Sequence, residues 1–316
     1  RVLDQTQAPK DAVGTFTSGG TESILLAVKA AVEWFRANKA DANNSSGAAS
    51  GTQNEPLELV LSTTTHAAFH KAAHYMGLKV VLVDVDLQTF RAVPEKIAAA
   101  ITPRTAMVVV SAPSLAHGVI DPVSAVSDLC VTRGIWLHVG ACVGGWLLPY
   151  FRRLGSNLPP YDFSVAGVTS MSVDLHKYAF APKGASVVLF RNAGFRQGSF
   201  YACADWTGYC LINTGLPSTK SGGPVAAAWA VLRHIGDEGY LEITRVIRTA
   251  AEKLISRINE IPELRVLGTP DLSLFSFTSD TVDVFHLYDE MKARGFHLRI
   301  HYARAGCPAG LHMYVT

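Results

Sequence analysis

Two patterns of apolar residues alternate along the chain. One consists of short β-branched runs, which are typical of buried strands, and in the other apolar residues recur at helical spacing. The helical pattern first appears directly after residues 17–23, where Ser18 or Thr21 is available to cap the helix start. Its apolar positions are Ile24, Leu25, Val28, Val32 and Phe35.

Beyond residue 56 the two patterns follow each other regularly. Strands are expected at 57–62, 79–84, 105–111 and 135–139, and helices at about 66–76, after Pro94 and at 121–134. Such an order predicts parallel strands joined by right-handed crossovers. Two further strands, at 167–173 and 185–190, have no long helix between them and predict a mixed sheet with an antiparallel member.

The longest apolar stretch covers residues 134–151. It contains His138 and four glycines, so we interpret it as a buried strand followed by a loop and not as a membrane span. Residues 38–56 are polar and rich in Ser, Gly and Asn, which predicts a flexible surface insertion.

The last third of the chain begins with a long helical region from Gly223. After it come strand patterns at 265–270, 272–278 and 311–316 and a helix at 282–294. We therefore expect a large domain over residues 1–236, which carries the insertion, and a smaller α+β domain over 237–316 that is incomplete. Because the chain starts with Arg1 and not Met, we expect a piece of a longer protein.

Composition narrows the class of protein. Hydrophobic residues make up 48% of the 316 residues and charged residues 17%, as in a globular protein. A net charge of +2 gives no case for nucleic acid or an anionic membrane surface as a partner. The five cysteines form no CxxC pair and no metal spacing, and their odd number argues against a disulfide framework. A reducing compartment is expected.

The first candidate site is residues 17–23, TSGGTES, which lead directly into a helix. Glycines allow close backbone approach, and the first helical N–H groups with the hydroxyls can hold a phosphate. The segment lacks the GxGxxG spacing of a dinucleotide site, and an ordinary capped helix explains it equally well.

His66, His70 and His74 stand four residues apart on one expected helix. A pair at this spacing can bind zinc, but no glutamate completes a HExxH motif and no third ligand is suggested, so no metal is predicted. His66 directly follows a strand and can instead offer its flat ring to a ligand.

Two more segments complete the set. The strand at 135–139 ends in small residues, and a ligand of an open α/β sheet lies beyond the carboxyl ends of its strands, so position 140 should face the site. Lys177 lies in an apolar segment, where a lysine must find an anion, lose its charge or form a covalent bond, unless it extends to solvent. A phosphate cradle, a flat ring, a strand end and a sequestered lysine together suit pyridoxal 5'-phosphate.

Longer motifs over nearly the whole chain support this cofactor. They are TSGGTESI (17–24), THAAFHKAAHYMGLKV (65–80), HGVIDPV (117–123), HVGACVGG (138–145), DLHKYAFAPKGASVVLF (174–190) and DWTGY (205–209). In these motifs the chain resembles the group II decarboxylases that depend on pyridoxal phosphate, and most closely their sphingosine-1-phosphate lyase branch.

The resemblance implies an α/β protein of the transferase-like fold type I, with a mostly parallel seven-stranded sheet and a homodimer whose active sites lie at the subunit interface. It makes Lys177 the Schiff-base lysine, His66 the ring-stacking residue and Lys183 a second lysine that assists with substrate. These three are the implied catalytic residues. The implied cofactor-binding residues are Ser18, Gly19, Gly20, Thr21, His66, Gly140, His176, Lys177 and Thr219.

Two positions depart from the family pattern. Gly140 stands where the family has an aspartate that faces the pyridine nitrogen, and Lys220, within 218–223, stands where it has an arginine that reaches the partner's cofactor phosphate. Lysine keeps the charge but loses the bidentate geometry. Without the aspartate, a protonated ring nitrogen is less favoured and the cofactor accepts electrons less well.

The resemblance implies cleavage of a phosphorylated sphingoid base to a fatty aldehyde and phosphoethanolamine. Its implied partner is thus a small phosphorylated amine. Two alternatives stay open: a decarboxylase of amino acids, and a homologue that binds the cofactor without activity. The expected location is the cytoplasm, or the cytosolic face of the endoplasmic reticulum membrane if an anchor precedes this chain.

Overall fold

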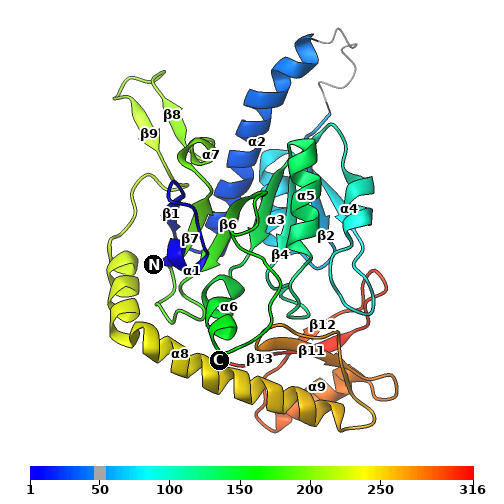
Figure 1. Ribbon diagram of the computed structural model, residues 1–316. Helices are drawn as coiled ribbons and strands as arrows, with labels where there is room; N and C mark the ends of the chain where they lie inside the picture. Colours follow the sequence, from blue (N-terminus) through cyan, green and yellow to red (C-terminus); the bar gives the residue numbers. More distant parts are fainter. Residues whose placement is uncertain (46–54) are drawn as a thin grey trace.

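The computed structural model describes the backbone of residues 1–45 and 55–316. It describes the side chains of residues 1–38 and 55–316. A seven-stranded sheet forms the centre of the molecule (Figure 1). Its strands are β1 (Val13–Thr17), β2 (Glu58–Ser62), β3 (Lys79–Val83), β4 (Thr105–Ser111), β5 (Trp136–Gly140), β6 (Val168–Asp174) and β7 (Ser186–Phe190). Their order is β1-β7-β6-β5-β4-β2-β3.

The expected mostly parallel sheet is confirmed. Strands β3, β2, β4, β5 and β6 pair in parallel, while β7 runs antiparallel to both of its neighbours, β6 and β1. All residues of β2, β4 and β6 are buried, which is why β2 and β4 appear in the sequence as continuous apolar runs, while β6 carries small hydroxyl residues between its apolar ones.

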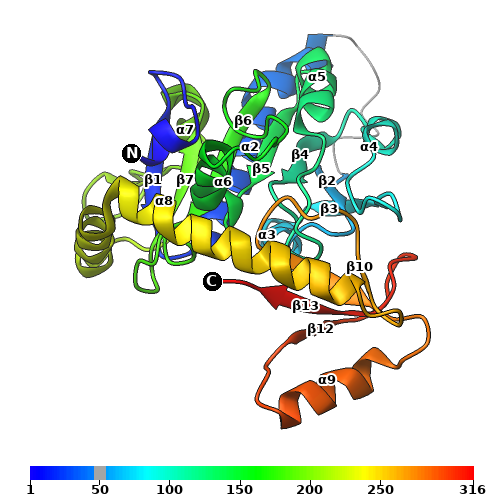
Figure 2. The ribbon, with the colours of Figure 1, turned by 60° about the horizontal axis from the view of Figure 1, so that its bottom comes forward.

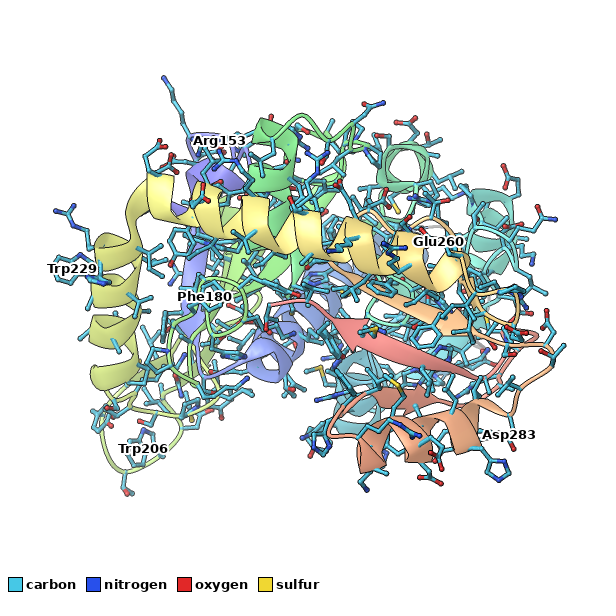
Figure 3. The ribbon with its side chains drawn as sticks, turned by 90° about the horizontal axis from the view of Figure 1, so that it is seen from below. Arg153, Phe180, Trp206, Trp229, Glu260 and Asp283 are labelled. Atoms are coloured by element: carbon cyan, nitrogen blue, oxygen red, sulfur yellow. The ribbon has the colours of Figure 1, made fainter. Side chains whose placement is uncertain are left out.

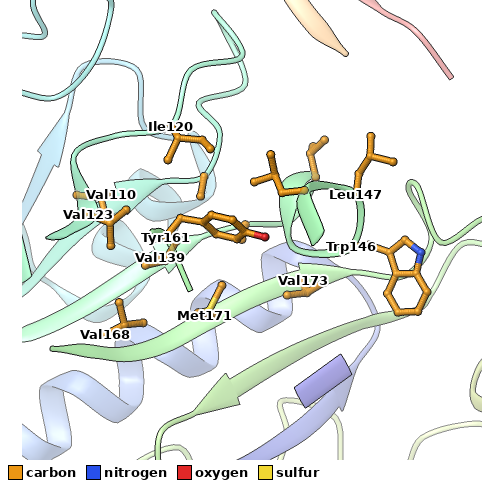
Figure 4. Close-up of a cluster of buried hydrophobic side chains, with 14 of the residues drawn as sticks. Val110, Ile120, Val123, Val139, Trp146, Leu147, Tyr161, Val168, Met171 and Val173 are labelled. Atoms are coloured by element: carbon orange, nitrogen blue, oxygen red, sulfur yellow. The ribbon is translucent and has the colours of Figure 1, made fainter. Parts of the chain in front are cut away.

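Helices cover both faces of this sheet (Figure 1). They are α1 (Val2–Gln5), α2 (Gly20–Ser45), α3 (Ala68–Met76), α4 (Pro94–Ala100), α5 (Val123–Arg133), α6 (Gly144–Arg153), α7 (Ala193–Gln197) and α8 (Gly223–Asn259). Successive strand residues point to opposite faces. Met107 and Val109 therefore pack with α2 and α3, while Val108 and Val110 belong to the core beneath α5 and α6 (Figure 4).

Helix α6 corrects one prediction, because residues 144–151 form a buried helix and not a loop. Every one of these residues is buried, so the segment has no polar face to mark a helical period, and Pro149 lies inside it. A Cβ on Gly145 would lie 2.6 Å from Val173 Cγ2, so the glycines that suggested a loop instead allow α6 to approach β6 closely.

The start of the expected insertion is also corrected. Helix α2 continues to Ser45, so residues 38–45 are helical. Residues 46–54, the centre of the predicted insertion, lie outside the described residues.

The C-terminal part forms a second, antiparallel sheet with the order β10-β11-β13-β12 (Figure 2). Its elements are β10 (Arg265–Val266), β11 (Leu274–Thr278), α9 (Val284–Ala293), β12 (Arg299–His301) and β13 (Gly310–Tyr314). Helix α8 spans the expected boundary between the domains and bends there, since Gly236 has a φ of 67°. The boundary itself stays a prediction.

The sequence patterns missed a projecting hairpin of β8 (Tyr201–Cys203) and β9 (Leu211–Asn213), which extends away from the central sheet (Figure 1). Strands of this length are too short to show a clear period. Among the helices of the described residues, none is long and apolar enough to span a bilayer.

Candidate active site

A cavity of about 400 Å³ opens at the carboxyl ends of the parallel strands, where a ligand of such a sheet is expected. Ser111, Gly140 and Asp174, the last residues of β4, β5 and β6, line it, and the N-terminus of α2 closes another side. The volume lies within the usual range for small-molecule sites. Eight residues singled out from the sequence also line it: Ser18, Gly19, Gly20, Thr21, His66, Gly140, His176 and Lys177.

Two other predicted residues lie outside this cavity. Lys183 and Thr219 are exposed and do not line it. His70 and His74 do not line it either, and no group of three or more His, Cys, Asp or Glu side chains in the described part of the chain is arranged to hold a metal ion.

The N-terminus of α2 presents unused donors to the cavity. Among the described residues, none supplies an acceptor to the backbone N–H of Gly19, Gly20 or Thr21. Ser18 does not cap the helix as predicted, by accepting a hydrogen bond from a helix N–H. It instead donates both its own N–H and its hydroxyl to Glu22 Oε2, each at 2.7 Å. The first N–H groups of the helix therefore stay available to an anion.

Glu22 is a buried acid that the sequence patterns did not single out. Its Oε1 accepts hydrogen bonds from the Leu216 N–H at 3.2 Å and pairs with Lys220 Nζ at 3.1 Å. Burial alone would raise the pKa of Glu22, but the hydrogen bonds from Ser18, Lys220 and Leu216 outweigh it and lower this pKa. Lys220 therefore neutralises an acid beside the helix N-terminus of its own chain.

His66 lies at the cavity wall, directly before α3. Its Nδ1 accepts a hydrogen bond from the Ala68 N–H at 3.1 Å, which fixes the ring and leaves Nε2 to carry the proton of the neutral form. Burial against the wall and the charge of Lys177 lower the pKa of His66. The ring is thus an uncharged, flat surface in the cavity.

Lys177 brings its amine into the same cavity from the loop after β6. Its Nζ lies 3.0 Å from Asp174 Oδ2, and its side chain is 31% exposed. Burial opposes the charge, but Cys142 and Asp174 beside it raise the pKa of Lys177. The loop is held by backbone bonds from Phe180 N to Lys177 O and from His176 N to Ala185 O, both at 3.0 Å.

Gly140 leaves space at the end of β5. A Cβ built there would meet nothing closer than Val110 O, at 3.7 Å, and Phe69, at 3.9 Å. The backbone thus accommodates a Cβ at the position where the family resemblance implies an aspartate. The carboxylates that line the cavity come instead from Glu22 and Asp174.

Comparison with known proteins assigns the chain to a family. Residues 2–279 match the model of the pyridoxal-dependent decarboxylase conserved domain. A sphingosine-1-phosphate lyase of Arabidopsis thaliana is 40% identical over 285 residues, 90% of this chain and 50% of that protein. Sphingosine-1-phosphate lyase 1 of Rattus norvegicus is 39% identical over 313 residues, 97% of this chain and 51% of that protein. The chain thus spans about half the length of these curated relatives.

Solved structures agree with this fold. A sphingosine-1-phosphate lyase of Burkholderia pseudomallei superposes with a TM-score of 0.91 at 37% identity and covers all of this chain and 70% of that one. A glutamate decarboxylase of Lactobacillus brevis gives a TM-score of 0.86 at 17% identity, over all of this chain and 73% of that one. The second likeness shows the fold alone.

Proposed function

The chain belongs to the family of pyridoxal-dependent decarboxylases, and from this premise we propose that it is a carbon–carbon lyase. Its proposed substrates are phosphorylated sphingoid bases of the sphingosine 1-phosphate type, cleaved to a fatty aldehyde and phosphoethanolamine. Relatives named for this reaction are 35–40% identical to the chain, whereas the glutamate decarboxylase is 17% identical. This difference favours the lyase over a decarboxylase of amino acids.

One observation carries the proposal: Lys177, His66 and the bare N-terminus of α2 line a single cavity. They come from three segments that are far apart in the sequence, and each supplies a feature that pyridoxal phosphate requires. The unpaired N–H groups of Gly19, Gly20 and Thr21 fit a phosphate. The uncharged ring of His66 fits a flat aromatic ring, and the Lys177 amine fits an aldehyde.

When bound, pyridoxal phosphate supplies an aldehyde that can join covalently to an amine, and a conjugated ring that accepts electrons from the breaking bond. The chain's own groups would bind and orient it. Gly19, Gly20 and Thr21 would hold the phosphate, His66 would lie against the ring, and Lys177 would hold the aldehyde carbon. Phe69, Pro113 and Leu115 line the cavity and would exclude water from the reacting atoms.

The two exposed residues are proposed to act from outside the cavity. Lys183 lies six residues beyond Lys177 and is exposed, and it is proposed to assist with the substrate. Thr219 belongs to an exposed segment next to Lys220 and is proposed to contribute to a cofactor site only across a subunit interface.

A homodimer is part of this proposal. Large apolar side chains are exposed on the β8–β9 hairpin, the loop after it and the first half of α8, which project from the body of the chain (Figures 1 and 3). The patch comprises Tyr201, Trp206, Tyr209, Ile212, Leu216 and Trp229. We call the hairpin, the loop after it and the first half of α8 the arm. Because aromatic residues are enriched at interfaces, we assign the arm to the contact with a second copy. The location at a cytosolic membrane face stays a prediction.

Gly140 favours a second candidate, a homologue that binds the cofactor without turnover. The structure has room for a Cβ at this position, which faces the cavity, but no carboxylate stands there, so an unprotonated ring nitrogen would withdraw electrons less well. Cleavage of a carbon–carbon bond next to a hydroxyl is assisted by the carbonyl that forms, so it should tolerate a weaker electron sink better than decarboxylation does.

One experiment separates these candidates. The purified full-length protein is incubated with pyridoxal phosphate and either sphingosine 1-phosphate or a panel of amino acids. Release of fatty aldehyde and phosphoethanolamine supports the lyase, and release of carbon dioxide from an amino acid overturns it. Bound cofactor with neither product supports the inactive homologue.

A further inference from the structure

Asp174, the last residue of β6, places a carboxylate directly against Lys177. The side chain is 2% exposed, and its Oδ2 lies 3.0 Å from Lys177 Nζ and 3.6 Å from His176 Nε2. Its Oδ1 is buried and has no hydrogen-bond partner within the described residues. Asp174 therefore has unused capacity to accept a proton beside the amine that would hold the cofactor.

The carboxylate is held in place. The Asp174 N–H donates to Cys142 O at 3.1 Å, which fixes the backbone beside the loop after β5. A Cβ on Gly20 would lie 2.9 Å from both carboxylate oxygens, so α2 passes close enough to restrict any other orientation. The acid is thus confined between the N-terminus of α2 and Lys177.

We propose that Asp174 is a further catalytic residue, which accepts a proton from Lys177 as the cofactor is captured and returns it to the oxygen that leaves as water. The inference rests on the proposed function, because it requires an aldehyde that reacts with Lys177. It assigns a role in forming the covalent link, beyond the binding roles described above.

The proton and electron balance of this step closes. Transfer of one proton breaks an N–H bond of the ammonium group, leaves the electron pair on Nζ and forms an O–H bond at Oδ2. The pair forms the bond to the aldehyde carbon, and a second proton moves from Nζ to the aldehyde oxygen. As Asp174 returns its proton to this oxygen, the C–O bond breaks, water leaves and the remaining nitrogen pair forms the second bond to carbon. The positive charge stays on nitrogen and faces the restored carboxylate.

Other titratable groups surround Lys177, but among the described residues the hydrogen-bonded ion pair of its amine is with Asp174 Oδ2, at 3.0 Å. The other groups are His66 before α3, Cys142 after β5, His176 beside Lys177 and Tyr314 of β13. Burial lowers the pKa of both histidines, and it raises the pKa of Cys142 to about 12, so this thiol already holds its proton. Glu22 is occupied by Ser18, Leu216 and Lys220.

The first test needs no cofactor. Cofactor-free protein is acetylated with acetic anhydride over a range of pH, and the Lys177 and Lys183 peptides are quantified by mass spectrometry. In the wild type, the midpoint for Lys177 should lie above that of the exposed Lys183. Asp174→Asn should lower the Lys177 midpoint by at least about one pH unit, because the facing carboxylate is lost. The matched surface change Asp237→Asn should leave it unchanged.

The second test measures capture of pyridoxal phosphate, trapped with borohydride at timed intervals. At about pH 7, where Lys177 of the wild type carries its proton, the capture rate is divided by the fraction of neutral Lys177 that the first test gives for each protein. This normalised rate should be at least about 100-fold lower for Asp174→Asn, as loss of an acid–base group predicts. An unchanged normalised rate overturns the proton-transfer role even if the acetylation midpoint moves.

The outcomes keep this inference distinct from the proposed function. If the wild type captures no cofactor, the proposed function fails and this role falls with it, whatever acetylation shows. If the wild type captures cofactor and Asp174→Asn behaves like it in both tests, only the role of Asp174 is wrong. Should Asp174→Asn fail to fold, judged by circular dichroism, a wild-type Lys177 midpoint at or below that of Lys183 overturns the inference.

Discussion

At the scale of residues, the main feature of the cavity is where its carboxylates lie. Gly140 at the end of β5 carries no charge, while Asp174 at the end of the neighbouring β6 is paired with Lys177. A pyridine nitrogen becomes protonated where a carboxylate faces it. Because the acids of the cavity, Asp174 and Glu22, lie on β6 and α2 and not on β5, we expect the cofactor to be held firmly but to be a modest electron sink.

Gly140→Asp tests this directly. The space around the built Cβ accepts the side chain, and we expect lyase turnover to rise at least about tenfold, or roughly 1.4 kcal/mol of transition-state stabilisation. This is conservative, since a buried charge pair is worth about 3 to 5 kcal/mol when one partner is removed. Gly140→Asn has nearly the same shape without the charge and should not reproduce the gain. Equal turnover of the wild type and the two variants would show that another group controls the protonation of the ring nitrogen.

Local sequence was sufficient to single out Lys177, His66 and the residues 18–21, which the structure brings to one cavity, while their roles stay predictions. Asp174 and Glu22 were not found this way. The contacts of Glu22 come from a remote segment, because Lys220 Nζ, which pairs with it, also donates to Phe16 O at 2.7 Å. Asp174 lies only three residues before Lys177, but its burial and the free position of its Oδ1 depend on the fold. The sequence did carry one signal for Glu22: a serine at the start of the helix, Ser18, followed four residues later by an acid with which it can form a hydrogen bond.

At the scale of elements, the strands of the central sheet could be predicted from short β-branched runs, and the amphipathic helices from the period of their one buried face. Helix α6 could not, because it is buried all round, and β12 could not, because it is short and partly exposed. Both are placed by packing against other elements, which a local pattern does not record.

Strands β12 and β13 contact the loop between β4 and α5 through three histidines. His117 stacks on Phe90 with ring centroids 4.2 Å apart and lies 5.7 Å from His301, while His312 Nδ1 lies 3.1 Å from Ala116 O. Both ring nitrogens of His117 are buried without a partner in the described part of the chain. Burial, with the neighbouring histidines, lowers the pKa of His117 to about 3.

This cluster predicts acid lability. The folded protein holds His117 and His312 neutral, with the pKa of His312 lowered to about 4, whereas the unfolded chain binds protons below about pH 6.5. Stability from the cluster is therefore complete above pH 6.5 and is lost as the pH falls, by up to about 1.4 kcal/mol per pH unit and histidine. His117→Phe should flatten the fall of the free energy of unfolding between pH 6.5 and 5, measured by urea denaturation, while the exposed-site control His234→Phe should not. The same slope in both variants would contradict the prediction.

The whole molecule combines a layered α/β body with an arm that leaves it. The central sheet positions the cavity, and α8 links the arm to the C-terminal sheet (Figures 1 and 2). Exposed aromatic residues gather on the arm, with Trp229 65% and Tyr209 66% exposed. Such exposure is unfavourable for a single chain, and under the proposed homodimer we expect the second copy to cover it.

Trp229→Asp is expected to weaken self-association without unfolding the chain. Loss of a central aromatic contact of about 2 kcal/mol would raise the dissociation constant roughly 30-fold. Sedimentation equilibrium would measure it, with Val131→Asp, at an equally exposed site on α5, as the control. Equal dissociation constants for the two variants would remove the arm from the interface.

The covalent attachment site of the cofactor is the most direct test of the proposed site. The wild-type protein is incubated with pyridoxal phosphate, reduced with borohydride, digested and mapped by mass spectrometry, alongside Lys177→Ala and Lys183→Ala. We predict that the reduced cofactor is found on the Lys177 peptide of the wild type and of Lys183→Ala, and is absent from Lys177→Ala. Attachment at another lysine, or retention of fixed cofactor by Lys177→Ala, would contradict the assignment of this cavity.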